Sequence, residues 1–532
     1  MRPAALGRAS RYSQGRVFGI SHPDRFRRCF SHEISQETCS SVAKLLQWKP
    51  TPDHVADNPP QVVINGFVRS VRSMKSIRFV ALGDGSSLAP LQAIVDTKHA
   101  EGLTVGAAVR LSGAWVSSPG ASQSHELHVS KVEVLGPSDA KTFPIQKKYQ
   151  TPEFLRTLPH LRPRTPLNAA LLRFRSDAIA SLTQFFASRT FTQTHPPIIT
   201  SSDCEGAGEV FTVTPATETA DQANTDAKKD DSFFRSKKYL TVSGQLHLEA
   251  LSQSVGNVWT LSPAFRAERS DTSRHLSEFY MLEAEMSFVD NLGAVMDLTE
   301  DMLRFLAKSL YETAAVKELL SRSSQSGSDL APLDEVRRRW EGLMDPSWPR
   351  ITYTEALGLL QKNAEMFTEK PTWGMNLQSE HEKFIAMSVG GGQKPVFVTD
   401  YPRDIKAFYM RPNQPTAEQP NATVECFDLL VPEVCEIAGG SMREHRLEPL
   451  QDAMKRHGIL KPAMDVNGNV IPDADGNGPT SNLDWYVDLR RWGCPPHGGF
   501  GLGFDRLLCY LSGVQTIRDI VAFPRWVGRC DC

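Results

Sequence analysis

Two segments of the chain carry the residue types that chemistry on a phosphate requires. FRAERSDTSRHLSEFYMLEAEMSF, residues 265–288, has the pattern of a strand, an arginine-bearing loop and a second strand. GFGLGFDRLLCYLSGVQTIRDIVAFPR, residues 499–525, has the pattern of a glycine-rich strand followed by a helix. Arginine can fork onto two phosphate oxygens, a geometry that lysine cannot match. Together the segments supply cations, an aromatic ring and carboxylates suited to a nucleoside triphosphate and a small zwitterion.

The second strand of the first segment could hold both ends of one extended ligand. Because side chains alternate along a strand, Phe279, Glu283 and Glu285 are expected on one face. Phe279 and Glu283 are four residues apart, which is roughly 13 Å along a strand at ~3.3 Å per residue. That is about the length of an aminoacyl adenylate from its adenine to its side chain. On the preceding strand, Arg266 and Glu268 are expected on a common face.

The simpler interpretation of any single arginine is an exposed surface charge. The joint pattern of FRAE, TSRH and EF, with GLGFDR more than 200 residues later, is far more specific. A dinucleotide-binding fingerprint is excluded, because Arg506 stands where the third glycine would be.

Both segments resemble motifs 2 and 3 of the class II aminoacyl-tRNA synthetases, and in detail the asparaginyl-tRNA synthetase family. TVSGQLHLEAL, PVFVTDYPRDIKAFYM and DLRRWGCPPHGGFGLGFDR also match that family. The resemblance covers roughly residues 61–525 and implies ATP and Mg²⁺ as cofactors. One departure is Arg269, where the family more often has asparagine.

The resemblance assigns roles to residues of the two motifs. It implies that Arg266 binds the α-phosphate, where charge builds during attack by the amino-acid carboxylate. Arg274 and His275 would bind the β- and γ-phosphates, and Arg506 would cover the adenine and reach the γ-phosphate. The three residues implied in catalysis are Arg266, Glu268 and Arg506. The other residues implied in ATP binding are Leu276, Phe279, Glu436, Gly439, Gly503, Phe504 and Asp505.

A third segment, CFDLLVPEVCEIAGGSMREHR, supplies acids and a further arginine. Asp428 and Glu436 are suited to Mg²⁺, which takes a few carboxylates together with phosphate oxygens. Acids paired with arginines in a structural network are the alternative. The residues that the resemblance implies in amino-acid binding are Glu205, Ser243, Gln245, Arg266, Glu283 and Arg443.

The choice of amino acid depends on one substitution in this pattern. Aspartyl enzymes carry SPQLxKQ, whose lysine binds the substrate carboxylate, whereas this chain has SGQLHLE with Leu248 at the lysine position. Glu283 is expected to accept hydrogen bonds from the side-chain NH₂ of asparagine, and Arg443 to donate to its carbonyl. Aspartate would bring two carboxylates together, which costs several kcal/mol in a desolvated site.

Residues 61–136 form five short β-rich runs punctuated by glycines, which predicts a small OB-fold barrel. Phe79 and Gln92 offer a stacking ring and an amide, the pair used to recognise unstacked RNA bases. Ordinary barrel core is the alternative for Phe79. The stretch resembles the anticodon-binding domain of the aspartyl, asparaginyl and lysyl enzymes, in which such a pair contacts the anticodon.

Composition excludes several other classes of protein. A chain of 532 residues predicts two or more domains. A net charge of −2 excludes a globally basic nucleic-acid binder. The cysteines are scattered without a CxxC pair, which favours a reducing compartment and no zinc site. No stretch approaches the ~18 consecutive apolar residues of a membrane span, so no membrane partner is expected.

The predicted organisation has four parts. Residues 1–50 are interpreted as a mitochondrial transit segment and leader, because the first thirty residues are rich in arginine and poor in acids. A disordered basic tail is the alternative. An OB-fold anticodon-binding domain is expected over 51–140, a hinge linker over 141–166, and a class II catalytic domain over 167–532. The fold class is α+β, with an antiparallel sheet flanked by helices and insertions near 215–233 and 462–482.

The sequence therefore predicts ATP-dependent ligation of asparagine to tRNA(Asn) through an asparaginyl-adenylate, in the mitochondrial matrix. THPPIIT, residues 194–200, resembles the dimer-forming motif 1 and implies a homodimer. An aspartyl-tRNA synthetase, including one that serves both tRNAs, is the first alternative, and Leu248 argues against it. A non-catalytic RNA-binding paralogue is the second, and the presence of Arg266, Glu436 and Arg506 argues against it. The intact barrel disfavours a relative that makes asparagine without tRNA.

Overall fold

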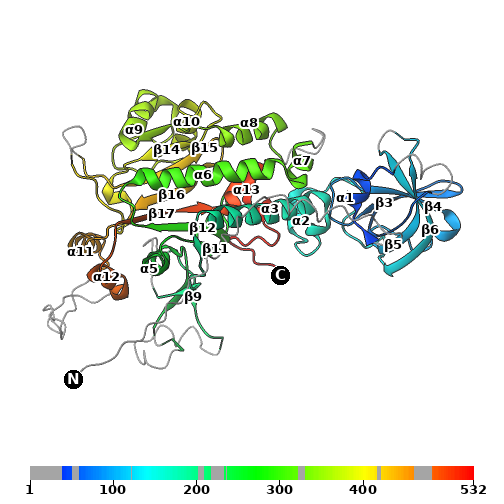
Figure 1. The fold of residues 1–532 in the computed structure, drawn as a ribbon, viewed down its shortest axis with the longest axis horizontal. Helices are drawn as coiled ribbons and strands as arrows, with labels where there is room; N and C mark the ends of the chain where they lie inside the picture. Colours follow the sequence, from blue (N-terminus) through cyan, green and yellow to red (C-terminus); the bar gives the residue numbers. More distant parts are fainter. Residues whose placement is uncertain are drawn as a thin grey trace, which may run out of the picture. The chain divides into compact units, whose positions relative to one another are not determined.

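The computed structural model describes residues 39–50, 59–120, 123–201, 209–216, 233–234, 236–321, 330–415, 421–460 and 482–532. These residues belong to two compact units (Figure 1). The first unit consists of the residues up to 82 and residues 91–140, and the second consists of residues 83–90 and 141–532. Glu205, most of the predicted transit segment and most of both insertions lie outside the described residues. Among the described helices, none is long and apolar enough to cross a membrane.

The first unit is a closed β-barrel, as the sequence predicts. Its strands are β1 (Cys39–Ser40), β2 (Gln61–Ser73), β3 (Ile77–Gly83), β4 (Leu91–Asp96), β5 (Ala108–Ser117) and β6 (His125–Gly136). They pair in the order β1-β2-β3-β4-β6-β5, and an additional β2–β5 pairing closes the barrel. Alternate strand residues such as Val80 and Leu82 fill the interior, together with Val42 and Leu45 of α1 (Val42–Gln47).

The second unit is built on an eight-stranded sheet. Its strands, in spatial order, are β13 (Arg350–Thr352), β14 (Val396–Thr399), β15 (Cys426–Val431), β16 (Cys435–Met442), β17 (His497–Gly503), β12 (Glu278–Ser287), β11 (Val258–Phe265) and β7 (Thr192–Gln193). The sheet is mixed, because the β13–β14 and β11–β7 pairings at its two edges are parallel. The central pairings are antiparallel, as predicted. A small sheet of β8 (Ile199–Thr200), β10 (Lys238–Leu240) and β9 (Thr212–Val213) accompanies it.

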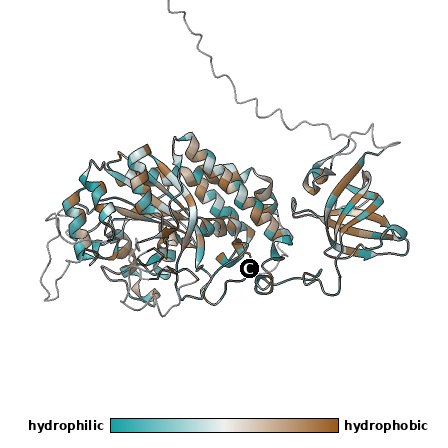
Figure 2. Cartoon of the chain, turned by 90° about the horizontal axis from the view of Figure 1, so that it is seen from below, coloured by the Kyte–Doolittle hydropathy of each residue, from teal (hydrophilic) through white to brown (hydrophobic). Residues whose placement is uncertain are grey.

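Helices flank this sheet. They are α2 (Pro152–Arg156), α3 (Pro166–Ser188), α5 (Gln245–Val255), α6 (Leu292–Tyr311), α7 (Ala314–Ser321), α8 (Leu333–Met344), α9 (Tyr353–Lys362), α10 (Ser379–Ser388), α11 (Leu447–Arg456), α12 (Asp484–Arg491), α13 (Phe504–Ser512) and α14 (Ile517–Ile520). Figure 2 shows hydrophobic residues gathered on the strands and on one side of the helices. In α6 the Asn291 side chain caps the first turn, and Val295, Met302, Leu306 and Leu310 recur at helical spacing on the buried face.

The strand before the arginine-bearing loop is shorter than the sequence predicts. Strand β11 ends at Phe265, so the prediction that Arg266 and Glu268 share a strand face is wrong. Just past the strand, the Arg266 N–H donates to the Ser277 carbonyl at 3.0 Å and the Ala267 N–H donates to the Glu209 carbonyl at 2.8 Å. The two side chains still lie near each other, with 3.8 Å between Arg266 Nη1 and Glu268 Oε1.

Candidate active site

A cavity of about 310 Å³ lies on the central strands of the second unit. Its walls come from β12, β15, β16 and β17, from the start of α5 and from the segment before residue 411. Eight of the residues predicted from the sequence line it: Ser243, Gln245, Arg266, Glu283, Asp428, Glu436, Gly439 and Arg443. The sheet therefore brings together residues that are up to 200 positions apart in the chain.

Glu283 is a fixed hydrogen-bond acceptor in the cavity wall. Its carboxylate is buried, with only 3% of the residue exposed. The Ser243 hydroxyl donates to Oε1, and the Gly244 N–H donates to Oε2 at 2.9 Å. Gly244 packs tightly against this carboxylate, because a Cβ there would lie 3.0 Å from Glu283 Oε2 and 3.2 Å from Pro196 Cγ. Both carboxylate oxygens are thus held in place while the side chain faces the cavity.

Arg443 follows β16 and is held by a second buried acid. Its Nε and Nη2 donate to Glu285 at 3.1 and 2.9 Å, and its Nη1 donates to Ser441 Oγ at 2.5 Å. A guanidinium has five N–H donors and these contacts use three, so two remain to donate to a ligand. Burial raises the pKa of Glu285, and the charge of Arg443 opposes this shift. Gly499 makes room for the pair, because a Cβ at 499 would collide with Glu285 Oε2.

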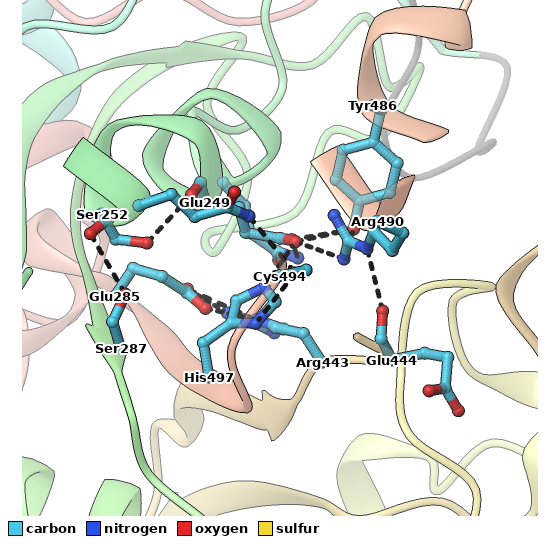
Figure 3. Close-up of polar contacts among 12 residues, drawn as sticks. Glu249, Ser252, Glu285, Ser287, Arg443, Glu444, Tyr486, Arg490, Cys494 and His497 are labelled. Atoms are coloured by element: carbon cyan, nitrogen blue, oxygen red, sulfur yellow. Dashed lines mark hydrogen bonds and ion pairs between the residues drawn. The ribbon is translucent and has the colours of Figure 1, made fainter. Parts of the chain in front are cut away.

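A fully buried carboxylate, Glu249, connects the cavity wall to α12 (Figure 3). Arg490 Nη2 donates to its Oε2 at 2.7 Å, and the Tyr486 hydroxyl lies 2.8 and 3.0 Å from the two oxygens. Gln245, which lines the cavity, donates its Nε2–H to Glu249 Oε1 at 3.1 Å. Burial would raise the pKa of Glu249, but Arg490 and His497 hold it far below its usual value. Glu249 therefore stays ionised and fixes Gln245.

His497, at the start of β17, completes this network as a cation. Its Nε2 lies 3.0 Å from Glu249 Oε2, and its Nδ1 lies 2.8 Å from the Pro495 carbonyl oxygen. Both partners are acceptors, and only a protonated imidazole donates from both nitrogens. Burial lowers the pKa of His497, but the contacts with Cys494 and Glu249 outweigh burial and raise it to about 10.

The other end of the cavity carries the two predicted metal ligands. A Cβ placed on Gly439 would lie 3.3 Å from Asp428 Oδ1 and 3.4 Å from Glu436 Oε1, so both carboxylates converge over this glycine. Burial and the charge of Asp428 raise the pKa of Glu436 to about 7. Within the described parts of the chain, no group of three histidine, cysteine or acidic side chains could hold a metal by itself. Two carboxylates nonetheless fit Mg²⁺, which takes its remaining ligands from phosphates and water.

Lys406 is a cavity residue that the sequence analysis missed. Its Nζ lies 2.7 and 3.0 Å from the two oxygens of Asp428 and 4.0 Å from the centre of the Tyr401 ring. One feature of the sequence could have pointed to Lys406. It is the only charged residue in the apolar run IKAFYM, in a stretch that resembles the synthetase family.

The α-phosphate end of the predicted site contains a cation and an aromatic ring. The guanidinium of Arg266 lies 5.7 Å from the centre of the Phe279 ring. Arg506, in the first turn of α13, donates from Nη1 to the Glu436 carbonyl oxygen at 2.6 Å. This bond places Arg506 beside the convergent carboxylates, where a nucleotide phosphate would bind.

The two loop residues predicted to bind the β- and γ-phosphates do not line the main cavity. Arg274 donates to Ser379 Oγ at 2.9 Å and, with Arg506, lines a neighbouring cavity of about 290 Å³. His275 Nε2 lies 3.1 Å from Glu268 Oε2.

Two family models match this chain. The family model "tRNA synthetases class II (D, K and N)" matches residues 151–527, and the model "OB-fold nucleic acid binding domain" matches residues 62–135. A protein of Clostridium tetani named asparagine–tRNA ligase is 42% identical over 477 residues, which are 88% of this chain and 96% of the relative. The chain belongs to the asparagine–tRNA ligase family.

Other members of the family give the same result. The mitochondrial asparagine–tRNA ligase of Schizosaccharomyces pombe is 40% identical over 481 residues, covering 89% of this chain and 96% of the relative. The asparaginyl-tRNA synthetase of Pyrococcus horikoshii, solved with asparaginyl-adenylate, matches with a TM-score of 0.71 and 27% identity. That match covers 91% of this chain and 99% of the solved chain. The predicted family and fold class are confirmed.

Several predicted ATP-binding residues of this synthetase lie in the core. Leu276 and Phe504 are buried in the main hydrophobic cluster. Asp505 is buried too, where it pairs with Arg175 and accepts the Tyr280 N–H at 2.7 Å. None of the three lines the 310 Å³ cavity, and the Asp505 carboxylate holds β12 through the Tyr280 N–H. Gly503 packs against Arg506, whose Cβ would be 3.4 Å from a Cβ at 503.

In the barrel of the synthetase, Phe79 lies outside the hydrophobic core, so the alternative of an ordinary core residue is wrong. Strands β3 and β4 pair Phe79 with Ile94 and Ala81 with Gln92. Phe79 and Gln92 therefore share the face opposite to the buried Val80. Arg72 stacks over the Phe79 ring at 4.7 Å, and Gln92 Nε2 donates to Glu126 at 3.0 Å.

Proposed function

We propose that this synthetase ligates asparagine to tRNA(Asn) in two steps, through an asparaginyl-adenylate. The observation that carries the proposal is the pairing of Glu283 and Arg443 in one cavity, because a fixed acceptor and a fixed donor match the two halves of a carboxamide. The names of the relatives and the adenylate bound to the Pyrococcus enzyme support it.

In the first step a carboxylate oxygen of asparagine attacks the α-phosphorus of ATP, and the bond to the bridging oxygen breaks to release pyrophosphate. Arg266 stabilises the negative charge that grows on the α-phosphate. Gln245 and Ser243 hold the amino acid beside it. Asp428 and Glu436 would hold Mg²⁺, which would supply further positive charge to the phosphates.

In the second step a terminal ribose hydroxyl of the tRNA attacks the activated carbonyl carbon. The carbon–oxygen bond to AMP breaks, an α-phosphate oxygen of the departing AMP takes the hydroxyl proton, and asparaginyl-tRNA forms. The barrel supplies Phe79 and Gln92 to bind the anticodon. In the sequence, both residues precede the residues that line the cavity.

Selection against aspartate follows from the charges around the side-chain pocket. Leu248 contributes no cation to the cavity wall, and Glu285 already occupies one side of Arg443. A second substrate carboxylate would face Glu283 without a new partner. Sites that satisfy the polar groups of one substrate reject analogues by ~10⁴–10⁵.

The decisive measurement is amino-acid-dependent ATP–pyrophosphate exchange by the purified chain. We expect asparagine to support exchange and aspartate to support it at least about 10³-fold less efficiently. Faster exchange with aspartate would favour the aspartyl-tRNA synthetase alternative. An absence of exchange with either amino acid, in a chain that still binds tRNA, would favour the non-catalytic paralogue.

Replacing Phe79 with alanine is expected to lower kcat/KM for tRNA(Asn) by roughly tenfold or more, because one stacked base contributes about 1–3 kcal/mol. Pyrophosphate exchange does not involve the anticodon and is expected to stay unchanged. Phe67→Ala is the matched control, since Phe67 is an exposed aromatic residue of the same barrel. Equal losses in the two variants would argue against a specific stacking role for Phe79.

We further propose that the enzyme works in the mitochondrial matrix and is a homodimer. The arginine-rich composition of the first thirty residues supports the first point, as do the mitochondrial relatives in Schizosaccharomyces pombe and Saccharomyces cerevisiae. Ile198 and Ile199, in the stretch that resembles motif 1, have 40% and 43% of their surface exposed in the single chain. Burial of these apolar side chains against a second copy would stabilise a dimer.

A further inference from the structure

The search for a function beyond these roles leads to Lys406, which no step above uses. It follows the short 3₁₀ turn Arg403–Ile405 and lies in the cavity wall. Its side chain is 17% exposed and that of its partner Asp428 is 14% exposed. The ammonium contacts both carboxylate oxygens, so it occupies the atoms that Asp428 would offer to a metal ion.

Lys406 is a charged group held in place by this pair. Burial lowers the pKa of Lys406, but the charge of Asp428 outweighs burial and keeps the ammonium protonated. The Tyr401 ring packs against the ammonium from another side, at 4.0 Å from the ring centre. A desolvated ammonium is retained only where it has such partners.

The second carboxylate of the site converges on the same place. Gly439 leaves a gap in which a single Cβ would touch the carboxylates of both Asp428 and Glu436. Mg²⁺ binds oxygen ligands at about 2.0–2.1 Å. An ion bound to an Asp428 oxygen would therefore lie within a few ångströms of Lys406 Nζ, which sits 2.7 Å from one of these oxygens. Two cations so close repel each other strongly in a partly desolvated site.

We propose that Lys406 competes with the divalent cation for Asp428 and so makes metal binding depend on ATP. The phosphates of ATP bring additional oxygen ligands and negative charge, which tip the competition toward the metal. The ammonium then becomes available to the phosphates instead. This inference rests on the proposed function only in taking Asp428 and Glu436 as the site for Mg²⁺.

The test is direct titration of the metal-stripped full chain with Mn²⁺, followed by the electron paramagnetic resonance signal of free Mn²⁺, without nucleotide. Lys406→Met is expected to bind Mn²⁺ about tenfold more tightly than the unmodified chain, because a nearby like charge has been removed. Lys394→Met is the matched control, since Lys394 also pairs with an aspartate, Asp345, at 3.0 Å but outside the cavity. It is expected to leave Mn²⁺ affinity unchanged.

The double variant Lys406→Met/Asp428→Asn identifies the atoms involved. If the competition is for Asp428, the double variant loses the gain in Mn²⁺ affinity. Unchanged or weaker binding by Lys406→Met overturns the proposal, and so does a gain that persists without the Asp428 carboxylate. Misfolding cannot mimic a gain that depends on one carboxylate. Asparagine-dependent exchange by the unmodified chain, measured on the same preparation, separates failure of this inference from failure of the proposed function.

Discussion

Replacing Arg266 with alanine is expected to lower the rate of asparagine-dependent pyrophosphate exchange by about 10³-fold or more. Arg266 lines the cavity beside Phe279 and is the candidate for contact with the α-phosphate. The negative charge on that phosphate grows in the transition state, so most of the loss should appear in kcat rather than in KM. Binding of tRNA through the barrel should remain measurable.

Two further substitutions give this experiment its controls. Arg266→Lys keeps the charge but loses the forked geometry, and its exchange rate is expected between those of the alanine variant and the unmodified enzyme. Arg269→Ala removes an exposed arginine three residues away that is not among the cavity-lining residues, and a loss of less than about fivefold is expected. Near-normal exchange by a folded Arg266→Ala variant would contradict the assigned role.

The local elements around the site follow directly from the sequence. Alternation in EFYMLEAEMSF gives β12, on which Glu283 and Glu285 are both buried, and the glycines of β17 permit its close approach to the neighbouring strand. The central antiparallel pairings and the barrel were predictable for the same reason, since strand periods and turns are local signals. The edge pairings were not, because they depend on distant segments.

The composition of the cavity wall required more than local pattern. The resemblance to the synthetase family predicted that Ser243, Glu283 and Arg443 belong to one site, and all three line the same cavity. It did not distinguish residues that line the cavity from buried residues such as Phe504 and Asp505. A sequence motif contains residues that line the cavity and also residues that are buried beside it.

Contacts between distant positions account for what the sequence analysis missed. Lys406 meets Asp428 across 22 residues, and Glu249 meets Arg490 across 241 residues. No periodicity encodes such pairs. Just past the end of β11 the backbone also makes a contact with a distant segment, the bond from the Ala267 N–H to the Glu209 carbonyl. Propensity along the strand could not reveal it.

The buried network behind the cavity leads to the prediction with the largest effect on stability. Replacing Arg490 with methionine is expected to lower the free energy of unfolding by about 3–5 kcal/mol, because it leaves a buried carboxylate with less compensation. Arg490 and Glu249 are both 0% exposed and lie 2.7 Å apart. The Tyr486 hydroxyl and His497 remain as partners of Glu249, which places the expected loss nearer the lower value.

Urea titration of Arg490→Met and of Arg189→Met measures this contribution against a matched surface pair. Arg189 and Asp301 lie 2.9 Å apart, but their side chains are 44% and 43% exposed. Such pairs contribute about 1 kcal/mol or less, so the control should lose little. Because Glu249 also holds Gln245, the Arg490 variant should show a raised KM for asparagine at temperatures where it is still folded. Equal stability losses in the two variants would mean that burial of the network contributes nothing beyond an ordinary surface ion pair.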